Sequence, residues 1–178
     1  MKKVQILDKS FKISIEEKDI QQSIKTIAED MNKDLFKKDI VFLGILNGSF
    51  MFAGDLFKHL DLNCQITFLK IASYQGTKSV GKVKELIGIN EDIKDKTVVI
   101  IEDIIDTGNT LEFIINELKN YKPAEIKIAT LLHKPSVYKK DINIDYIGIN
   151  ISNEFIVGYG LDYNGFGRNF KDIYTIIK

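Results

Sequence analysis

Residues 98–110 read VVIIEDIIDTGNT, an apolar run that leads into two adjacent carboxylates and a turn of small residues. Four β-branched residues in a row are typical of a central parallel strand covered on both faces. In open α/β sheets, ligands bind outside the carboxyl ends of such strands. The stretch therefore predicts a buried strand that ends at a binding site, with Glu102 and Asp103 at that end.

The polar groups that follow the apolar run indicate what this site binds. Paired carboxylates accept hydrogen bonds from vicinal hydroxyls or hold a hard cation. Residues 106–110 offer backbone N–H groups and two hydroxyls at a predicted helix start. Such a loop binds a phosphate monoester. The alternative is a buried strand followed by an acidic turn with no binding role.

The rest of the chain alternates between the two kinds of element. Apolar residues at helical spacing predict an amphipathic helix over residues 20–35. Further helices are predicted at residues 50–60 and 111–118, and further strands at residues 40–46, 66–71, 83–87, 126–132 and 144–149. This order predicts an α/β fold with a mostly parallel sheet flanked by helices. Antiparallel additions near residues 66–88 are expected to form a small hood or flap.

Composition limits the class of protein. With 178 residues, 44% of them hydrophobic, residues 1–178 are expected to form a single domain. The lone Cys64 excludes an internal disulfide and suits the cytoplasm. Twenty-five basic and 25 acidic residues balance, so neither nucleic acid nor a membrane surface is an expected partner. The mixed charged and apolar start does not resemble a signal peptide.

The stretch VVIIEDIIDTGNT resembles the phosphoribosyl pyrophosphate (PRPP) motif of type I phosphoribosyltransferases, and its aspartate at position 106 resembles the 6-oxopurine branch. The resemblance implies that Glu102 and Asp103 bind the ribose hydroxyls, directly or through Mg²⁺. The implied 5′-phosphate loop consists of Asp106, Thr107, Gly108, Asn109 and Thr110. Asp106 would also take a proton from the imidazole-ring nitrogen of the purine as general base. Its alternative role is the N-cap of the following helix.

Two further segments match loops of that family. Leu46, Asn47 and Gly48 resemble the first loop, in which a cis peptide between the first two residues exposes an N–H to pyrophosphate. Many relatives have lysine at position 47, so Asn47 is not expected to make a charge contact. Ser73 and Tyr74 match the start of a mobile lid that closes over bound PRPP.

The carboxyl-terminal third supplies the implied base and pyrophosphate contacts. Lys134 matches a lysine that donates to the exocyclic oxygen of a 6-oxopurine. Phe155 would stack on the purine, and Ile156 would offer backbone groups to its edge. Asp162 would bind Mg²⁺ beside the purine, and Arg168, the only arginine, would clamp pyrophosphate.

The resemblance implies an enzyme of purine salvage. It would transfer the phosphoribosyl group of PRPP to hypoxanthine, and also to guanine, giving IMP or GMP and pyrophosphate with the help of Mg²⁺. A homodimer or homotetramer is expected. Transfer to xanthine is an alternative, whereas Lys134 together with Asp106 argues against uracil. A PRPP-sensing regulator on the same fold is a further alternative.

Overall fold

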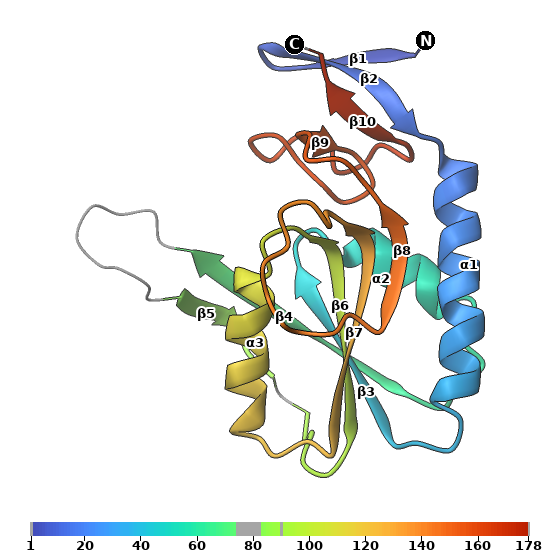
Figure 1. The fold of residues 1–178 in the computed structure, drawn as a ribbon, viewed down its shortest axis with the longest axis vertical. Coiled ribbons are helices and arrows are strands. Elements are labelled where there is room, and N and C mark those ends of the chain that lie inside the picture. Colours follow the sequence, from blue (N-terminus) through green and yellow to red (C-terminus); the bar gives the residue numbers. More distant parts are fainter. Residues whose placement is uncertain (1, 74–82, 90, 178) are drawn as a thin grey trace.

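The computed structural model describes residues 2–73, 83–89 and 91–177, which form two sheets and three helices (Figure 1). The larger sheet has the strand order β5-β4-β3-β6-β7-β8. Its strands are β3 (Ile40–Leu46), β4 (Gln65–Ser73), β5 (Val83–Ile87), β6 (Thr97–Ile105), β7 (Glu125–His133) and β8 (Tyr146–Asn150). Neighbouring strands are parallel except β4 and β5, which pair antiparallel. The predicted α/β architecture with a mostly parallel sheet is therefore confirmed.

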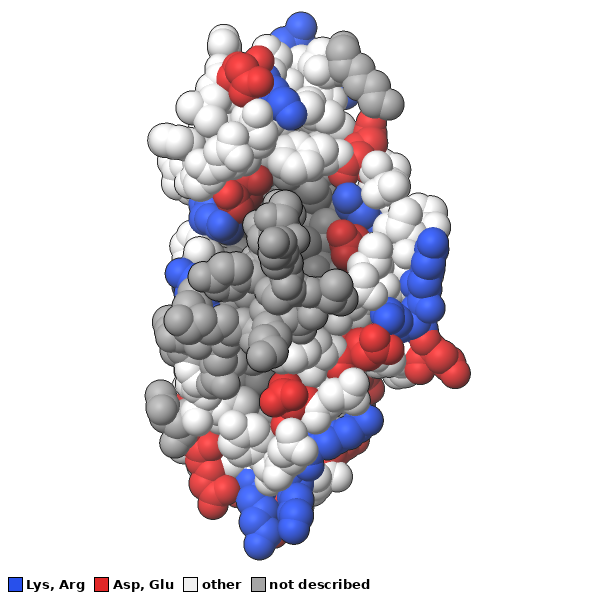
Figure 2. All heavy atoms as spheres, turned by 90° about the vertical axis from the view of Figure 1, so that its left-hand side faces the viewer, with Lys and Arg blue, Asp and Glu red and all other residues white. Residues whose placement is uncertain are grey.

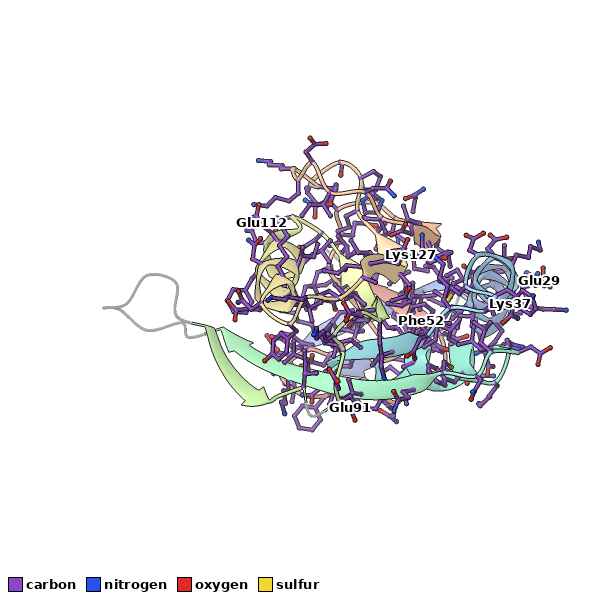
Figure 3. The ribbon with its side chains drawn as sticks, turned by 90° about the horizontal axis from the view of Figure 1, so that it is seen from below. Glu29, Lys37, Phe52, Glu91, Glu112 and Lys127 are labelled. Carbon is purple, nitrogen blue, oxygen red and sulfur yellow. The ribbon has the colours of Figure 1, made fainter. Side chains whose placement is uncertain are left out.

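Helices cover both faces of this sheet. The helices α1 (Glu17–Asp34) and α2 (Phe50–Phe57) pack on one face, and α3 (Asn109–Lys119) packs on the other. Alternate residues of β6 point to opposite faces of the sheet. Val99 and Ile101 pack in the core beneath α1 and α2, and Val98 and Ile100 pack in the core beneath α3. Phe52 of α2 is fully buried in the first of these cores (Figure 3). The apolar run of β6 is continuous because both of its faces are covered.

A smaller antiparallel sheet brings the two ends of the chain together above the larger one (Figure 1). It has the order β1-β2-β10-β9. Its strands are β1 (Lys3–Ile6), β2 (Lys9–Ile15), β9 (Ile156–Val157) and β10 (Ile173–Ile176). Ile6, Phe11, Val157 and Tyr174 form its own apolar cluster. The predicted antiparallel addition near residues 66–88 is present as β4 and β5, but the hood itself comes from the chain ends.

Several elements differ from their predicted bounds. The first helix begins three residues before Ile20, and α2 ends at Phe57, before the predicted residue 60. More important for the site, β6 continues through the two carboxylates to Ile105, which lies opposite His133 of β7. Glu102 and Asp103 are therefore held in a paired strand and not in a loop.

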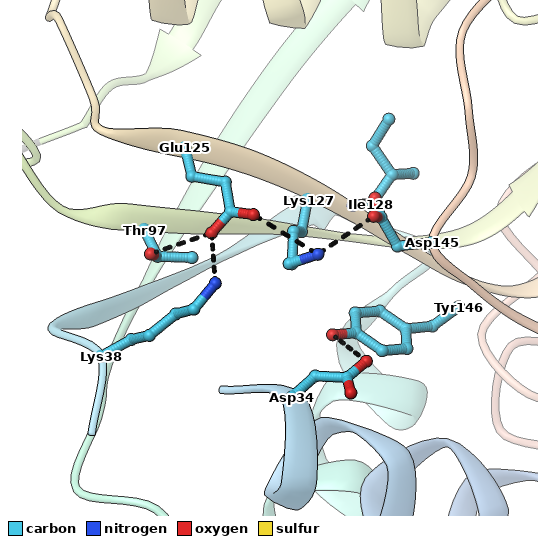
Figure 4. A network of polar contacts seen from close by, with 8 residues as sticks. All are labelled: Asp34, Lys38, Thr97, Glu125, Lys127, Ile128, Asp145 and Tyr146. Atoms are coloured by element: carbon cyan, nitrogen blue, oxygen red, sulfur yellow. Dashed lines mark hydrogen bonds and ion pairs between the residues drawn. The ribbon is translucent and has the colours of Figure 1, made fainter. Parts of the chain in front are cut away.

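The amino ends of β6 and β7 carry a network of ion pairs (Figure 4). Glu125 accepts a hydrogen bond from Lys38 Nζ at 2.6 Å and lies 3.5 Å from Lys127 Nζ, which also pairs with Asp145. The hydrogen bond from Lys38 is the main cause that lowers the pKa of Glu125 below its ordinary value. These charged side chains pair with one another, so the network is explained by a structural role at this end of the sheet.

Charge is dispersed on the face shown in Figure 2, where described Lys and Arg side chains lie among Asp and Glu side chains. This agrees with the formal net charge of zero. No helix in the described part of the chain is both long enough and apolar enough to cross a membrane.

Candidate active site

The two central strands, β3 and β6, are parallel neighbours from which the chain leaves in opposite directions. From β3 the chain passes through α2 to β4, and from β6 it passes through α3 to β7, on the opposite face. Such a divergence leaves a crevice at the carboxyl ends of the two strands. A cavity of about 290 Å³ lies there. The described residues that line it are Ile45, Leu46, Gly48, Glu102, Asp103, Ile104, Ile105, Asp106, Gly108, Thr110 and Leu111.

The predicted acidic pair lies in the wall of this cavity. Glu102 is only 6% exposed. Burial raises its pKa well above the ordinary value, and the carboxylates of Asp103 and Asp106 raise it further. Burial also raises the pKa of Asp103 to about 6, against the opposing effect of two backbone N–H groups and the Arg168 guanidinium. A cation or a pair of hydroxyls would favour the charged forms of both carboxylates, so the pair is suited to such a ligand.

Gly48 stands between the acidic pair and the carboxyl-terminal tail. A Cβ at Gly48 would lie 1.6 Å from Asp103 Oδ2. On its other side, a Cβ at Gly160 would lie 2.0 Å from the Gly48 carbonyl oxygen, and Gly160 has a φ of +96°. Neither position has room for a side chain, so this contact holds β6, the loop after β3 and the tail together.

The loop of residues 46–48 has the backbone that the resemblance implies. The peptide bond between Leu46 and Asn47 is cis. Leu46 and Gly48 line the cavity. The side chain of Asn47 is exposed.

The predicted phosphate loop turns directly into α3. Gly108 is the N-cap of that helix, with a φ of +82°, and no side chain caps the helix there. The backbone carbonyl of Gly108 already accepts a hydrogen bond from Glu112 N–H, as the first helical turn requires. The free amides at a helix N-terminus, together with the positive end of the helix dipole, favour an anion. Residues 106–110 thus present the kind of site that a phosphate group needs.

Asp106 does not act as the N-cap of α3. Its exposed carboxylate accepts a hydrogen bond from the N–H of the next residue, Thr107. Since the helix begins three residues later, at Asn109, and its N-cap is Gly108, the alternative prediction of Asp106 as the helix cap is wrong. Asp106 lines the cavity instead, which leaves its carboxylate available to a ligand.

The predicted purine-binding residues come together between β7 and β9. Lys134 Nζ donates to the backbone carbonyl of Glu154 at 2.9 Å, immediately before Phe155. The ring of Phe155 is 45% exposed. Its carbonyl accepts a hydrogen bond from Ile176 N–H of β10. Because backbone groups alternate in direction along an antiparallel strand, those of Ile156 point away from β10, toward the open edge of β9.

Asp162 and Arg168 form one ion pair in the tail. Arg168 Nη2 lies 2.5 Å from Asp162 Oδ1, and Arg168 Nη1 donates to the Gly160 carbonyl at 2.6 Å. Asp162 Oδ2 accepts from Gly165 N–H at 2.6 Å. Both charges act on Asp103: the Arg168 guanidinium lowers the pKa of that carboxyl, and the Asp162 carboxylate raises it. The lone arginine is therefore placed by the tail next to the acidic pair.

A group of supporting residues was not anticipated. Phe155 packs edge-on against Tyr163, and the Phe11 ring lies 6.3 Å from both of these rings. Lys9 Nζ lies 4.7 Å from the Tyr163 ring centroid. The alternation of polar and apolar residues from Ser10 to Ile15 was a signal for β2. The contact between this strand and Phe155, in contrast, depends on the tertiary fold.

The predicted lid is described only at its beginning. Ser73 is the last residue of β4, and its backbone pairs with Val83 of β5. Tyr74 lies outside the described residues.

We expect Asp103→Asn to stabilise the ligand-free protein in alkaline buffer. Because the folded pKa of about 6 exceeds the ordinary value of 3.8, the folded state binds more protons between these values, and stability falls as the pH rises through them. Asparagine removes the poorly solvated charge, so the free energy of unfolding should rise by about 3 kcal/mol at pH 8. Urea denaturation from pH 4 to pH 8 measures this. The gain should shrink below pH 6; a gain that does not depend on pH would contradict the argument. Asp61→Asn, at an exposed site, is the control.

Comparisons with known proteins agree on one family. The family model for the phosphoribosyl transferase domain matches residues 14–164. Hypoxanthine-guanine phosphoribosyltransferase from Staphylococcus aureus is 42% identical over 92% of this chain and 92% of its own. The crystal structure of a hypoxanthine phosphoribosyltransferase from the same species has a TM-score of 0.87 and 41% identity, covering 93% of this chain and 91% of that one. The hypoxanthine-guanine enzyme from Bacillus anthracis has a TM-score of 0.86 and 38% identity, covering 94% and 97%.

Proposed function

The chain belongs to the phosphoribosyl transferase family, and on that basis we propose that it is a purine-salvage enzyme. It transfers the phosphoribosyl group of PRPP to a purine base, giving a nucleoside 5′-monophosphate and pyrophosphate. The single observation that carries this assignment is the crevice between β3 and β6, where an acidic pair and a phosphate-type loop line one cavity. The relatives favour neither a xanthine-preferring enzyme nor a PRPP-sensing regulator.

We propose that different residues of the cavity bind different groups of the substrate. The carboxylates of Glu102 and Asp103 accept hydrogen bonds from the ribose hydroxyls. Backbone amides of residues 106–110 surround the 5′-phosphate, where the helix dipole of α3 favours a dianion. Leu46 and Gly48 offer backbone groups to pyrophosphate, and Arg168 contacts it through the planar fork of its guanidinium.

The proton balance of the reaction requires a base. As the bond forms between the sugar and one imidazole-ring nitrogen of the purine, the ring must lose a proton. We propose that Asp106 takes it, because its carboxylate is exposed at the cavity. General-base assistance of this kind contributes about 10²- to 10⁴-fold to a rate.

The acidic residues fit a magnesium ion that is bound jointly with substrate. In the described part of the chain, no cluster of three or more His, Cys, Asp or Glu residues could hold a metal by itself. Mg²⁺ commonly uses one or two protein carboxylates and completes its shell with water and substrate phosphates. We propose Asp162, Glu102 and Asp103 as the residues that would hold it. When bound, it would neutralise the pyrophosphate leaving group.

Base selectivity follows from the donor at position 134. An ammonium group donates hydrogen bonds and accepts none, so it matches the exocyclic oxygen of hypoxanthine or guanine and not the amino group of adenine. We propose that Lys134 exchanges its bond to the Glu154 carbonyl for one to that oxygen. Phe155 stacks on the purine, Ile156 contacts its edge through backbone groups, and Asp162 lies beside it.

Lys134→Ala should weaken discrimination against adenine. Loss of a hydrogen bond from a charged donor should lower kcat/KM for hypoxanthine about 10- to 100-fold. The value for adenine, which gains nothing from this lysine, should change much less. Lys139→Ala, at a nearby exposed lysine, is the control. An unchanged ratio of hypoxanthine to adenine kcat/KM would remove Lys134 from base recognition.

A pyrophosphate-release assay tests the proposed reaction. Protein, PRPP and Mg²⁺ are combined with hypoxanthine, guanine, xanthine, adenine or uracil in parallel. Turnover should be largest with hypoxanthine and guanine. Absence of turnover with every purine would reject the assignment.

We further propose that residues 1–178 act as one domain, because the two ends of the chain share the smaller sheet that completes the site. A homodimer or homotetramer is the proposed assembly. The proposed location is the cytoplasm, a reducing compartment in which the lone Cys64 stays a thiol.

A further inference from the structure

The predicted phosphate loop has a second, outer face, and one aromatic ring covers it. A Cβ at Gly108 would lie 2.7 Å from Tyr138 Cε2 and 2.7 Å from Lys140 Cγ. The ring of Tyr138 thus occupies the space on which a side chain at position 108 would stand. Of these three residues Gly108 lines the cavity, whereas Tyr138 and Lys140 do not. The two side chains therefore support the loop from outside the ligand space.

Tyr138 is itself fixed from several directions. Its hydroxyl donates to the Ile142 carbonyl at 2.7 Å, and its backbone N–H donates to the Lys134 carbonyl at 3.1 Å. The ring of the buried His133 meets it edge-on, with 5.3 Å between the ring centroids. Because the hydroxyl, backbone and ring of Tyr138 are all held by contacts, the ring can fix the position of the glycine that it touches.

The segment that carries Tyr138 is also tied to the loop at both of its ends. At one end, Lys134 N–H donates to the carbonyl of Ile105, the residue before the loop. At the other end, Lys140 Nζ pairs at 2.7 Å with Glu112. Glu112 lies in the first turn of α3 and is labelled in Figure 3. The segment therefore contacts the chain just before and just after the loop, and Tyr138 packs against the middle of the loop.

We propose that Tyr138 is a positioning residue for the 5′-phosphate: its ring holds Gly108 so that the amides of residues 106–110 converge on one anion. The proposal rests on the proposed function of this loop. Gly108 needs such support because glycine has the widest backbone freedom of any residue and here adopts a left-handed φ of +82°. Without the ring, the loop gains alternative conformations, and the amides lose their common target.

The consequence is specific to ligands that carry the phosphate. IMP and inosine differ only in the 5′-phosphate, so the ratio of their inhibition constants measures what the loop contributes. Tyr138→Ala should reduce the preference for IMP over inosine about tenfold or more, because even a small displacement of the binding groups weakens their contacts with the ligand. Inosine alone should bind the variant and the wild type alike.

Three further variants separate positioning from general stability. Tyr138→Phe keeps the ring and should retain the preference within about twofold, since only one neutral hydrogen bond is lost. Tyr138→Leu keeps apolar volume without a flat ring and should lose the preference, which covers the case in which alanine does not fold. Tyr121→Ala removes an exposed tyrosine near the other end of α3 and should change nothing.

The outcomes distinguish this inference from the function on which it rests. If the wild type binds IMP no better than inosine, the proposed phosphate site fails. If the wild type prefers IMP and the alanine and leucine variants keep that preference, only the positioning role of Tyr138 is overturned. Equal weakening of both ligands would mean that Tyr138 merely stabilises the fold, which also overturns it.

Discussion

Asp106→Asn should lower kcat about 10²- to 10³-fold while changing the KM for PRPP by less than about threefold. Asparagine has nearly the shape of aspartate and keeps an oxygen that can accept the hydrogen bond from Thr107 N–H. It cannot take a proton from the purine. The loss should therefore appear in the chemical step and not in the ground-state contacts of the sugar and phosphate.

Steady-state kinetics in both directions measure this effect. The reverse reaction, in which IMP and pyrophosphate give hypoxanthine and PRPP, needs the proton returned to the same purine nitrogen, so it should slow by the same factor. Asp61→Asn, at an exposed site, is the matched control. Equal kcat in wild type and Asp106→Asn would exclude a general base at this position.

Gly48→Ala should abolish most of the activity without unfolding the protein. The added Cβ would lie 1.6 Å from Asp103 Oδ2, so either the carboxylate or the loop after β3 must move. Movement of the loop is opposed by Gly160, which packs against the Gly48 carbonyl from the other side. We expect kcat/KM to fall about 100-fold or more, because Asp103 is displaced from the ribose hydroxyls. Overpacking of this size destabilises by about 1–3 kcal/mol.

Gly54→Ala provides the control within the same region. Gly54 lies in α2, and apart from its chain neighbours and the backbone of its own helix no described atom lies within 4 Å of a Cβ placed there. Alanine should leave kcat/KM unchanged and raise stability by about 0.5–1 kcal/mol, since glycine disfavours a helix interior. Thermal unfolding and kinetics of both variants are compared at one temperature at which both are folded. Wild-type activity in Gly48→Ala would show that this contact does not position Asp103.

The middle of the fold could be predicted from sequence because its signals are local. The run from Val98 to Ile101 predicts a strand covered on both faces, and its residues do alternate between two cores. The small-residue turn and the helical spacing after it predict the loop and α3. The boundary of this strand was harder to predict: β6 runs on to Ile105, since pairing with β7 decides where the strand ends.

The hood could not be predicted in the same way because its strands are short and far apart in sequence. β9 has only two residues and exists because β10 pairs with it. The alternating pattern of β2 was readable, but its partner β10 lies more than 150 residues later, and no local pattern encodes that pairing. The support of Phe155 by Phe11 and Tyr163 was missed for this reason.

Contacts between loops were the other feature that could not be predicted from the sequence. The sequence predicts Gly48 as part of the first loop and gives Gly160 no role of its own. Only the structure shows that each lies against a neighbour from a distant segment. The same holds for Gly108 and Tyr138. Residue types at the site could be predicted from motifs, whereas the packing that positions them depends on three-dimensional proximity.

A crystal structure of the complex with IMP tests the central claim most directly. We predict that the 5′-phosphate lies in the cavity between β3 and β6, with its oxygens about 2.7–3.2 Å from backbone nitrogens of residues 106–110. The ribose hydroxyls should face Glu102 and Asp103. Nucleotide bound elsewhere, for example in the hollow between α1 and β8 that Thr26 and Gly148 line, with the cavity at the end of β6 empty, would contradict the account.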